Sequence, residues 1–197
     1  IPVIFTFFAF MPETWGGLNA YLDPRAVNAQ KEFLTAFVSR YRTANEILWD
    51  FINEPSFCSP QHLWLCRPNY DQFEAAAWSA WLQERYPFPT NEERLAHLQE
   101  LYRATSDEAL GLPKLEEFAD VNIFNDSRPV KVIDYRLFAQ EMFARWTKEM
   151  RAVVKNRSAQ LVTVGQDEGG TGESPSPHFF AESVDFTCIH NWWLNDD

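Results

Sequence analysis

Short apolar runs recur along the chain, separated by longer stretches with helical periodicity. Four of them have the length and the aromatic or β-branched content of buried strands: residues 3–8, 47–52, 161–164 and 184–189. Strands that are apolar on both faces are typical of parallel sheets, in which right-handed helical crossovers join neighbouring strands. The pattern therefore predicts an α/β fold.

The stretches between these runs predict helices at residues 24–41, 70–86, 91–105 and 131–155. The first should begin at Asp23-Pro24, because Asp accepts hydrogen bonds from a first turn and Pro fits the first helical position. Apolar spacing predicts its buried face, formed by Ala26, Phe33, Leu34, Phe37, Val38 and Tyr41. The long excursion of residues 56–130 is predicted to be a helical insertion, with a buried side formed by Trp78, Trp81, Leu82 and Tyr86.

Polar and aromatic residues cluster just beyond the predicted strands: Trp15, Asn53, Glu54, Gln166, Asp167, Glu168, His190, Trp192 and Trp193. In a (β/α)₈ barrel all strands end on one face, and that face holds the active site. The alternation alone does not separate a barrel from an open doubly wound sheet. No Gly-rich phosphate loop follows any strand, which disfavours nucleotide binding.

Glu54 is the strongest candidate for a catalytic residue. It directly follows an apolar strand, so its carboxyl group is expected at the rim of an apolar core, a setting that suits a general acid. The neighbouring Asn53 offers an amide that can hydrogen-bond a hydroxyl group. A solvated turn Asn-Glu-Pro is the alternative, and the strand that precedes it favours function.

Composition narrows the class of ligand. The net charge is −11, which argues against nucleic acid or an acidic membrane surface as a partner, and no apolar run is long enough to cross a bilayer. Aromatic residues make up 16% of the chain, with 8 Trp, several of them in predicted loops. Aromatic rings form flat platforms on which sugar rings stack, so a neutral carbohydrate fits better.

Cysteine and histidine content adds little. Cys58 and Cys66 share one predicted loop, where a disulfide and two reduced thiols are both compatible with the sequence. The four histidines have no spacing typical of a zinc site. Both ends fall beside predicted strands, which is the pattern expected of a segment from a longer protein.

The segment from Asp23-Pro24-Arg25-Ala26 to the run Glu46-Ile47-Leu48-Trp49-Asp50-Phe51-Ile52-Asn53-Glu54-Pro55 resembles clan A glycoside hydrolases. This resemblance implies a (β/α)₈ TIM barrel, incomplete here. Residues 1–197 would be a partial catalytic domain with about strands 3 to 6, and residues 56–130 an insertion after strand 4. It also implies a retaining mechanism without metal or organic cofactor, in which Glu54 is the acid/base and Asn53 holds the sugar's 2-hydroxyl.

Two groups within the clan share further features with the chain. The segments Trp15-Gly16-Gly17, Leu161-Val162-Thr163-Val164-Gly165 and Thr187-Cys188-Ile189-His190 resemble endo-β-mannanases and related family-five enzymes. The excursion, with Trp78-Ser79-Ala80-Trp81 and Asp134-Tyr135-Arg136, resembles bacterial β-galactosidases. The resemblance therefore implies action on β-linked hexosides in an oligosaccharide or polysaccharide, either mannosides or galactosides.

The resemblance implies further substrate contacts at His190, Trp192, Trp15 and Glu168. Trp192 stands where many members carry a Tyr that bonds the nucleophile, so that hydrogen bond is in doubt. The nucleophile, a Glu at the end of the seventh strand, is expected beyond these residues, because Glu168 would lie on the fifth strand. A barrel that binds carbohydrate without catalysis is the alternative, and a secreted or periplasmic location is slightly favoured over a cytoplasmic one. The sequence leaves the oligomeric state open.

Overall fold

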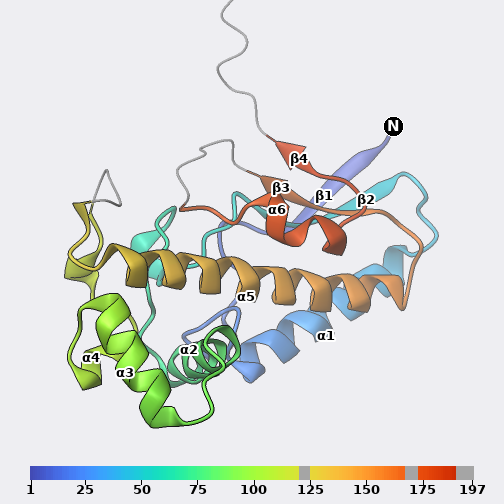
Figure 1. Ribbon diagram of the computed structural model, residues 1–197. Coiled ribbons are helices and arrows are strands. Elements are labelled where there is room, and N and C mark those ends of the chain that lie inside the picture. The colour runs from blue at the N-terminus through green and yellow to red at the C-terminus, as the bar shows by residue number, and fades with distance from the viewer. Residues whose placement is uncertain (120–124, 167–172, 190–197) are drawn as a thin grey trace, which may run out of the picture. The chain divides into compact units, whose positions relative to one another are not determined.

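The computed structural model describes residues 1–119, 125–166 and 173–189. Four parallel strands form one sheet in the order β1-β2-β3-β4, as the apolar runs predict (Figure 1). Their bounds are β1 Val3–Phe8, β2 Ile47–Asn53, β3 Val162–Gln166 and β4 Cys188–Ile189. Sequential strands are thus neighbours in space, and all carboxyl ends lie at the same edge of the sheet.

Strand β4 is shorter than the predicted run of residues 184–189. The segment before Cys188 is tied to the start of β3 by irregular bonds in place of a ladder. The Asp185 N–H donates to the Val162 carbonyl (2.9 Å), and the Thr163 hydroxyl donates to the Phe186 carbonyl (2.8 Å). A side-chain donor at Thr163 thus replaces part of the strand pairing, which an apolar pattern does not show.

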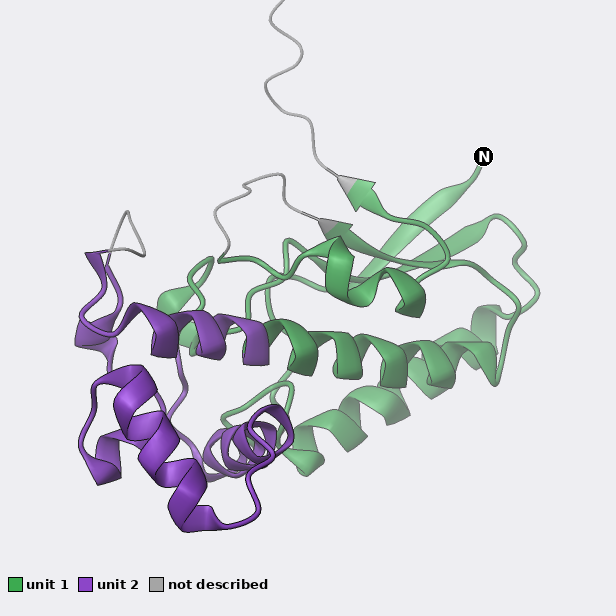
Figure 2. Cartoon of the chain, viewed as in Figure 1, with its two compact units in different colours: residues 1–66, 139–197 green, residues 67–138 purple. Residues whose placement is uncertain are grey.

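The helices follow the predicted order, with additional short elements. Their bounds are α1 Pro24–Tyr41, α2 Gln72–Arg85, α3 Asn91–Tyr102, α4 Ser106–Leu110, α5 Pro129–Lys155 and α6 Pro177–Phe180, with 3₁₀ turns at Pro60–His62, Leu115–Glu117 and Ala181–Ser183. The chain divides into two compact units, residues 1–66 with 139–197 (unit 1) and residues 67–138 (unit 2) (Figure 2). None of the helices in the described ranges is long and apolar enough to cross a membrane.

In unit 1, α1 and the C-terminal part of α5 cover the same face of the sheet. The Phe37 ring of α1 lies 5.9 Å from Trp49, and the Trp146 ring of α5 lies 6.4 Å from Phe51. Trp49 and Phe51 are two residues apart on β2, so their side chains share one face. Aromatic packing on this face forms the core that supports the sheet.

Helix α1 begins as predicted, since the Asp23 carboxylate accepts from the Arg25 N–H at 2.9 Å. Its buried side consists of Ala26, Gln30, Leu34 and Val38. The predicted stripe was wrong at its edges, because Phe33 and Tyr41 are each 37% exposed. Gln30 belongs to the buried face because the loop before α1 and helix α5 satisfy its amide: it donates to the Glu13 and Ala20 carbonyls and accepts from the Trp146 indole N–H (2.8 Å).

Unit 2 is helical and has its own core. Trp78 and Trp81 on α2 are buried as predicted, with stacked rings 5.3 Å apart. Helix α3 ends at Tyr102, three residues before the predicted end, because Arg103 adopts a left-handed backbone (φ 53°) that caps the helix. The short helix α4, which begins with a capping box at Thr105 and Glu108, was missed by the periodicity because it has only 5 residues.

Candidate functional site

Asn53 and Glu54 lie where β2 ends, at the carboxyl edge of the parallel sheet. Both side chains are half-buried, and Pro55 beyond them is buried. Neighbouring strands therefore flank the pair on both sides: β1 on one and β3 on the other. The two strand residues that precede the pair, Phe51 and Ile52, are fully buried.

Backbone hydrogen bonds hold this segment from both sides. The Asn53 N–H donates to the Ala9 carbonyl (3.1 Å), and the Ser56 N–H donates to the Phe10 carbonyl (2.8 Å), both just after β1. On the other side, the Glu54 N–H donates to the Gly165 carbonyl of β3 (2.8 Å). The segment around Glu54 is thus hydrogen-bonded on both sides, to the residues after β1 and to β3, so the sheet fixes the position of its backbone.

The backbone of Glu54 has a left-handed conformation, with φ at 49°. This region is unfavourable for residues with a Cβ atom and is populated mainly by Gly and Asn. Residues held in such conformations by their surroundings concentrate at functional sites. Trp15 (φ 31°) and Trp64 (φ 63°), in the loops that follow β1 and β2, share this property.

Trp15 lies in the loop after β1 and is 41% exposed. Its ring tilts against Phe33 of α1, with centroids 5.9 Å apart. The structure therefore gives Trp15 a packing contact, and its exposed remainder is available to a ligand. The other predicted substrate contacts, Glu168, His190 and Trp192, lie outside the described residues.

Trp64 is an aromatic residue that the sequence analysis did not single out. It is 47% exposed, and its ring lies 4.8 Å from that of Phe10. Its backbone N–H donates to the Ser56 hydroxyl (2.9 Å). These contacts hold an exposed indole beside the segment that follows Glu54. No periodic pattern marks Trp64, and only the folded loop places it there.

Asp50 is the second residue that sequence reasoning missed. It is buried in β2, and its carboxylate accepts from the Thr6 hydroxyl of β1 (2.8 Å) and the Gly165 N–H of β3 (2.8 Å). The signal was present in the sequence, since Asp50 is the one charged residue in the run Ile47-Leu48-Trp49-Asp50-Phe51-Ile52. A buried carboxylate requires partners, and here they come from both neighbouring strands.

The cysteines Cys58, Cys66 and Cys188, all within the described residues, form no disulfide. Cys58 and Cys66 are both buried, and the Cys58 sulfur lies 3.9 Å from that of Met11. The Cys66 N–H donates to the Glu173 carboxylate (2.8 Å). Burial, followed by the charge of Asp50, raises the pKa of the Cys188 thiol. Among the residues that the structure describes, no group of three His, Cys, Asp or Glu side chains could hold a metal ion.

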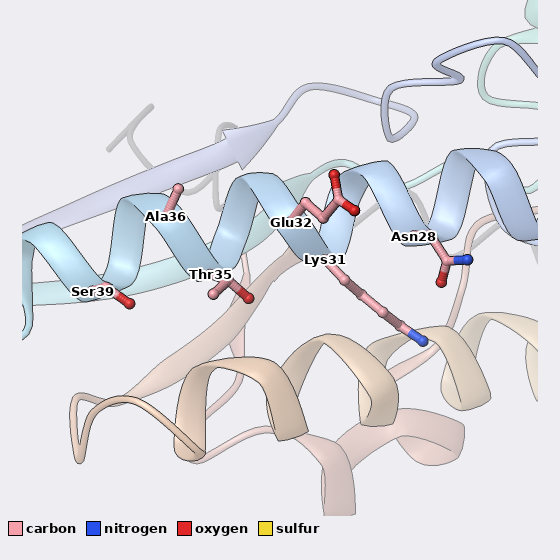
Figure 3. A pocket seen from close by; sticks show the side chains of 6 residues that line it. All are labelled: Asn28, Lys31, Glu32, Thr35, Ala36 and Ser39. Atoms are coloured by element: carbon pink, nitrogen blue, oxygen red, sulfur yellow. The ribbon is translucent and has the colours of Figure 1, made fainter.

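A hollow of about 460 Å³ lies along α1 (Figure 3). Its lining comes from one helix and consists of Asn28, Lys31, Glu32, Thr35, Ala36 and Ser39. Lys31 is paired with Glu149 of α5 at 2.5 Å. None of the residues that line the hollow belongs to the Asn53-Glu54 segment.

The fold resembles that of solved glycoside hydrolases. The β-galactosidase from the psychrophilic Marinomonas ef1 superposes with a TM-score of 0.64 at 15% identity, over 88% of this chain and 24% of that one. The β-galactosidase from Bacillus circulans sp. alkalophilus gives a TM-score of 0.64 at 19% identity, with the same shares of 88% and 24%. An exo-β-agarase gives 0.58 at 15% identity, over 96% of this chain and 27% of that one.

No family model matches the sequence, and neither does any curated protein. The chain spans about a quarter of the length of the enzymes that it resembles. At these identities the likeness concerns the fold alone. The chain therefore has a glycoside hydrolase-like α/β fold with a parallel sheet.

Proposed function

We propose that the chain is part of a retaining glycoside hydrolase with a (β/α)₈ barrel, in which β1 to β4 are the third to sixth strands. Three features support this arrangement: the strands are parallel and sequential, α1 and α5 cover one face, and the neighbours in fold are glycoside hydrolases. The observation that carries the proposal is Glu54, which stands beside Asn53 at a strand end on a strained, doubly tethered backbone.

Glu54 is proposed to work first as an acid and then as a base. It protonates the glycosidic oxygen while a second carboxylate attacks the anomeric carbon, and a glycosyl-enzyme forms as the leaving group departs with that proton. Glu54 then takes a proton from the water that releases the sugar. The second carboxylate must lie about 5–5.5 Å away in a retaining enzyme, and we expect it on the seventh strand, outside these 197 residues.

The substrate is proposed to be a β-linked hexoside. A β-galactoside is favoured over a mannoside, because several neighbours in fold are β-galactosidases. In this scheme Asn53 bonds the 2-hydroxyl, and the exposed ring of Trp15 is a stacking surface. Glu168, His190 and Trp192 remain proposed substrate contacts.

The test is the substitution Glu54→Gln in the protein at its natural length. For aryl and alkyl β-galactosides with poor leaving groups, kcat/KM should fall about 10³-fold, within the range for loss of a general acid. Dinitrophenyl β-galactoside needs little protonation, so its kcat/KM should fall less than about tenfold. Wild-type values for both substrates in the variant would remove Glu54 from the mechanism.

A matched control is Glu46→Gln, a substitution of the same kind just before β2. Glu46 lies at the opposite end of the strand, so both substrates should be hydrolysed as by the wild type. The alternative is a barrel that binds sugar without hydrolysis. It predicts that the wild-type protein binds galactosides, as measured by calorimetry, yet releases no hydrolysis product. That outcome would reject the enzymatic role and keep the fold.

A further inference from the structure

The buried carboxylate of Asp50, four residues before the proposed acid/base, connects β2 to both neighbouring strands. Asp50 is 4% exposed. Its Oδ2 accepts from the Thr6 hydroxyl (2.8 Å), and its Oδ1 accepts from the N–H of Gly165 (2.8 Å) and of Ile52 (3.2 Å). With three donors around it, this carboxylate is held in place, which suits a role in support and not in attack on a substrate.

The pairing of β2 with β3 is irregular at this point. Asp50 is opposite Thr163, and Asn53 is opposite Gly165, so β2 has one residue more than β3 between these pairs. An extra residue of this kind is a bulge, and bulges beside active sites redirect side chains. Within the bulge, the side chain of Asp50 accepts the hydrogen bond from the Gly165 N–H.

Gly165 connects Asp50 to Glu54. Its N–H is bound by Asp50, and its carbonyl accepts from the Glu54 N–H at 2.8 Å. A Cβ atom at this position would lie 3.0 Å from Asp50 Oδ2 and 3.3 Å from Asn53 Oδ1. A side chain at residue 165 would therefore push Asp50 or Asn53 away by a few tenths of an ångström.

We propose that Asp50 is a positioning residue for the general acid, which acts through Gly165 to fix the left-handed backbone of Glu54 and hence the direction of its carboxyl group. This inference rests on the proposed function of Glu54. Misplacement of a catalytic group by about 1 Å can cost roughly 10²-fold in rate. The loss should appear only where protonation of the leaving group matters.

The test compares Asp50→Ala with Asp50→Asn, using kcat/KM for a series of aryl β-galactosides with leaving groups of different pKa. Asp50→Ala should lose about 30- to 100-fold for poor leaving groups and less than about fivefold for dinitrophenyl, which steepens the dependence on the leaving group. In Asp50→Asn, the amide oxygen can accept from Gly165 while the amide N–H donates to Thr6. This conservative variant should therefore stay within about threefold of the wild type.

Thr163→Val is the structural control. Thr163 is buried on β3, two residues before Gly165, and its hydroxyl donates to the Phe186 carbonyl at 2.8 Å. Its loss should lower the melting temperature without a change in leaving-group dependence. Should Asp50→Ala fail to fold, Gly165→Ala tests the same connection, because its methyl group displaces Asp50 and Asn53.

The outcomes separate the two proposals. If Glu54→Gln steepens the leaving-group dependence and neither Asp50→Ala nor Gly165→Ala does, the positioning role is wrong and the function of Glu54 stands. If Glu54→Gln itself leaves the dependence unchanged, both proposals are overturned. A steeper dependence in Asp50→Ala together with a wild-type slope in Asp50→Asn and Thr163→Val supports the inference.

Discussion

The two units use buried carboxyl groups in different ways. In unit 1, Asp50 binds backbone and hydroxyl groups of neighbouring strands, directly beside the strained Glu54. In unit 2, Asp134 accepts from the hydroxyls of Tyr86 and Tyr102, both at 2.6 Å, and Glu74 has a similar role. Burial of an acidic residue therefore does not by itself mark an active site. What distinguishes unit 1 is that its buried acid lies on a parallel strand that ends at a second acid, Glu54.

Backbone strain shows the same contrast. In unit 2 the left-handed residues are Tyr70, one residue before the N-cap of α2, and Arg103, the C-cap of α3. Both lie at helix boundaries, and a left-handed residue is common at a helix C-terminus such as Arg103. In unit 1, Trp64 follows the C-cap of the 3₁₀ turn Pro60–His62, whereas Trp15 and Glu54 lie in loops after strands. Strain that no helix end explains is the kind that accompanies function.

The largest effect is expected from Asp134→Ala in unit 2. It removes the shared acceptor of two tyrosine hydroxyls, those of Tyr86 and Tyr102. Unpaired buried hydroxyls cost about 1–3 kcal/mol each, so the free energy of unfolding should fall by about 4 kcal/mol in urea denaturation. Leaving-group dependence should not change. A steeper dependence would contradict the contrast between the units.

A smaller change in the free energy of unfolding is expected when the pH is raised. Burial raises the pKa of Glu74 from 4.5 to about 7, although its bond from the Tyr135 hydroxyl (2.7 Å) opposes the shift. Between these two values the folded state keeps a proton that the unfolded state has lost. The stability that the folded protein has while Glu74 is protonated is therefore fully present below about pH 4.5 and is lost as the pH rises to about 7.

Glu74→Gln should remove this dependence. The amide can keep all three bonds: its oxygen accepts from the N–H groups of Asn69 and Tyr70, and its N–H donates to Tyr135. From pH 5 to 8 the free energy of unfolding of the wild type should fall by about 3 kcal/mol more than that of the variant, as measured in urea at each pH. Parallel curves for the two proteins would show that Glu74 is not the titrating group.

The smallest effect tests the strain itself. Glu54→Gly relieves the left-handed backbone, so this variant should be more stable than Glu54→Ala by about 1 kcal/mol, while both lose acid catalysis. Arg103→Gly, at the α3 cap in unit 2, should gain a similar amount over Arg103→Ala with full activity. Equal melting temperatures for the Gly and Ala variants at residue 54 would mean that the site stores no strain.

The sequence by itself determined the order of strands and helices and the place of the Asn53-Glu54 pair. Apolar runs defined β1 and β2 almost to the residue, because short runs of β-branched and aromatic residues favour a strand locally. Burial was not predicted as well, since the first four residues of β1 are exposed. The Asp23-Pro24 cap fixed the start of α1 in the same local way. These features depend on neighbours in sequence, so the chain shows them without its fold.

Tertiary structure alone decided the contacts around the pair. The bulge between β2 and β3, the bonds of Gly165 to Asp50 and Glu54, and the burial of Gln30 join residues that are far apart along the chain. The short β4 and the place of the Trp64 ring beside Phe10 likewise follow from contacts between distant segments that no periodicity encodes. Which strands and rings meet depends on packing of the whole sheet, and packing is not a local property of sequence.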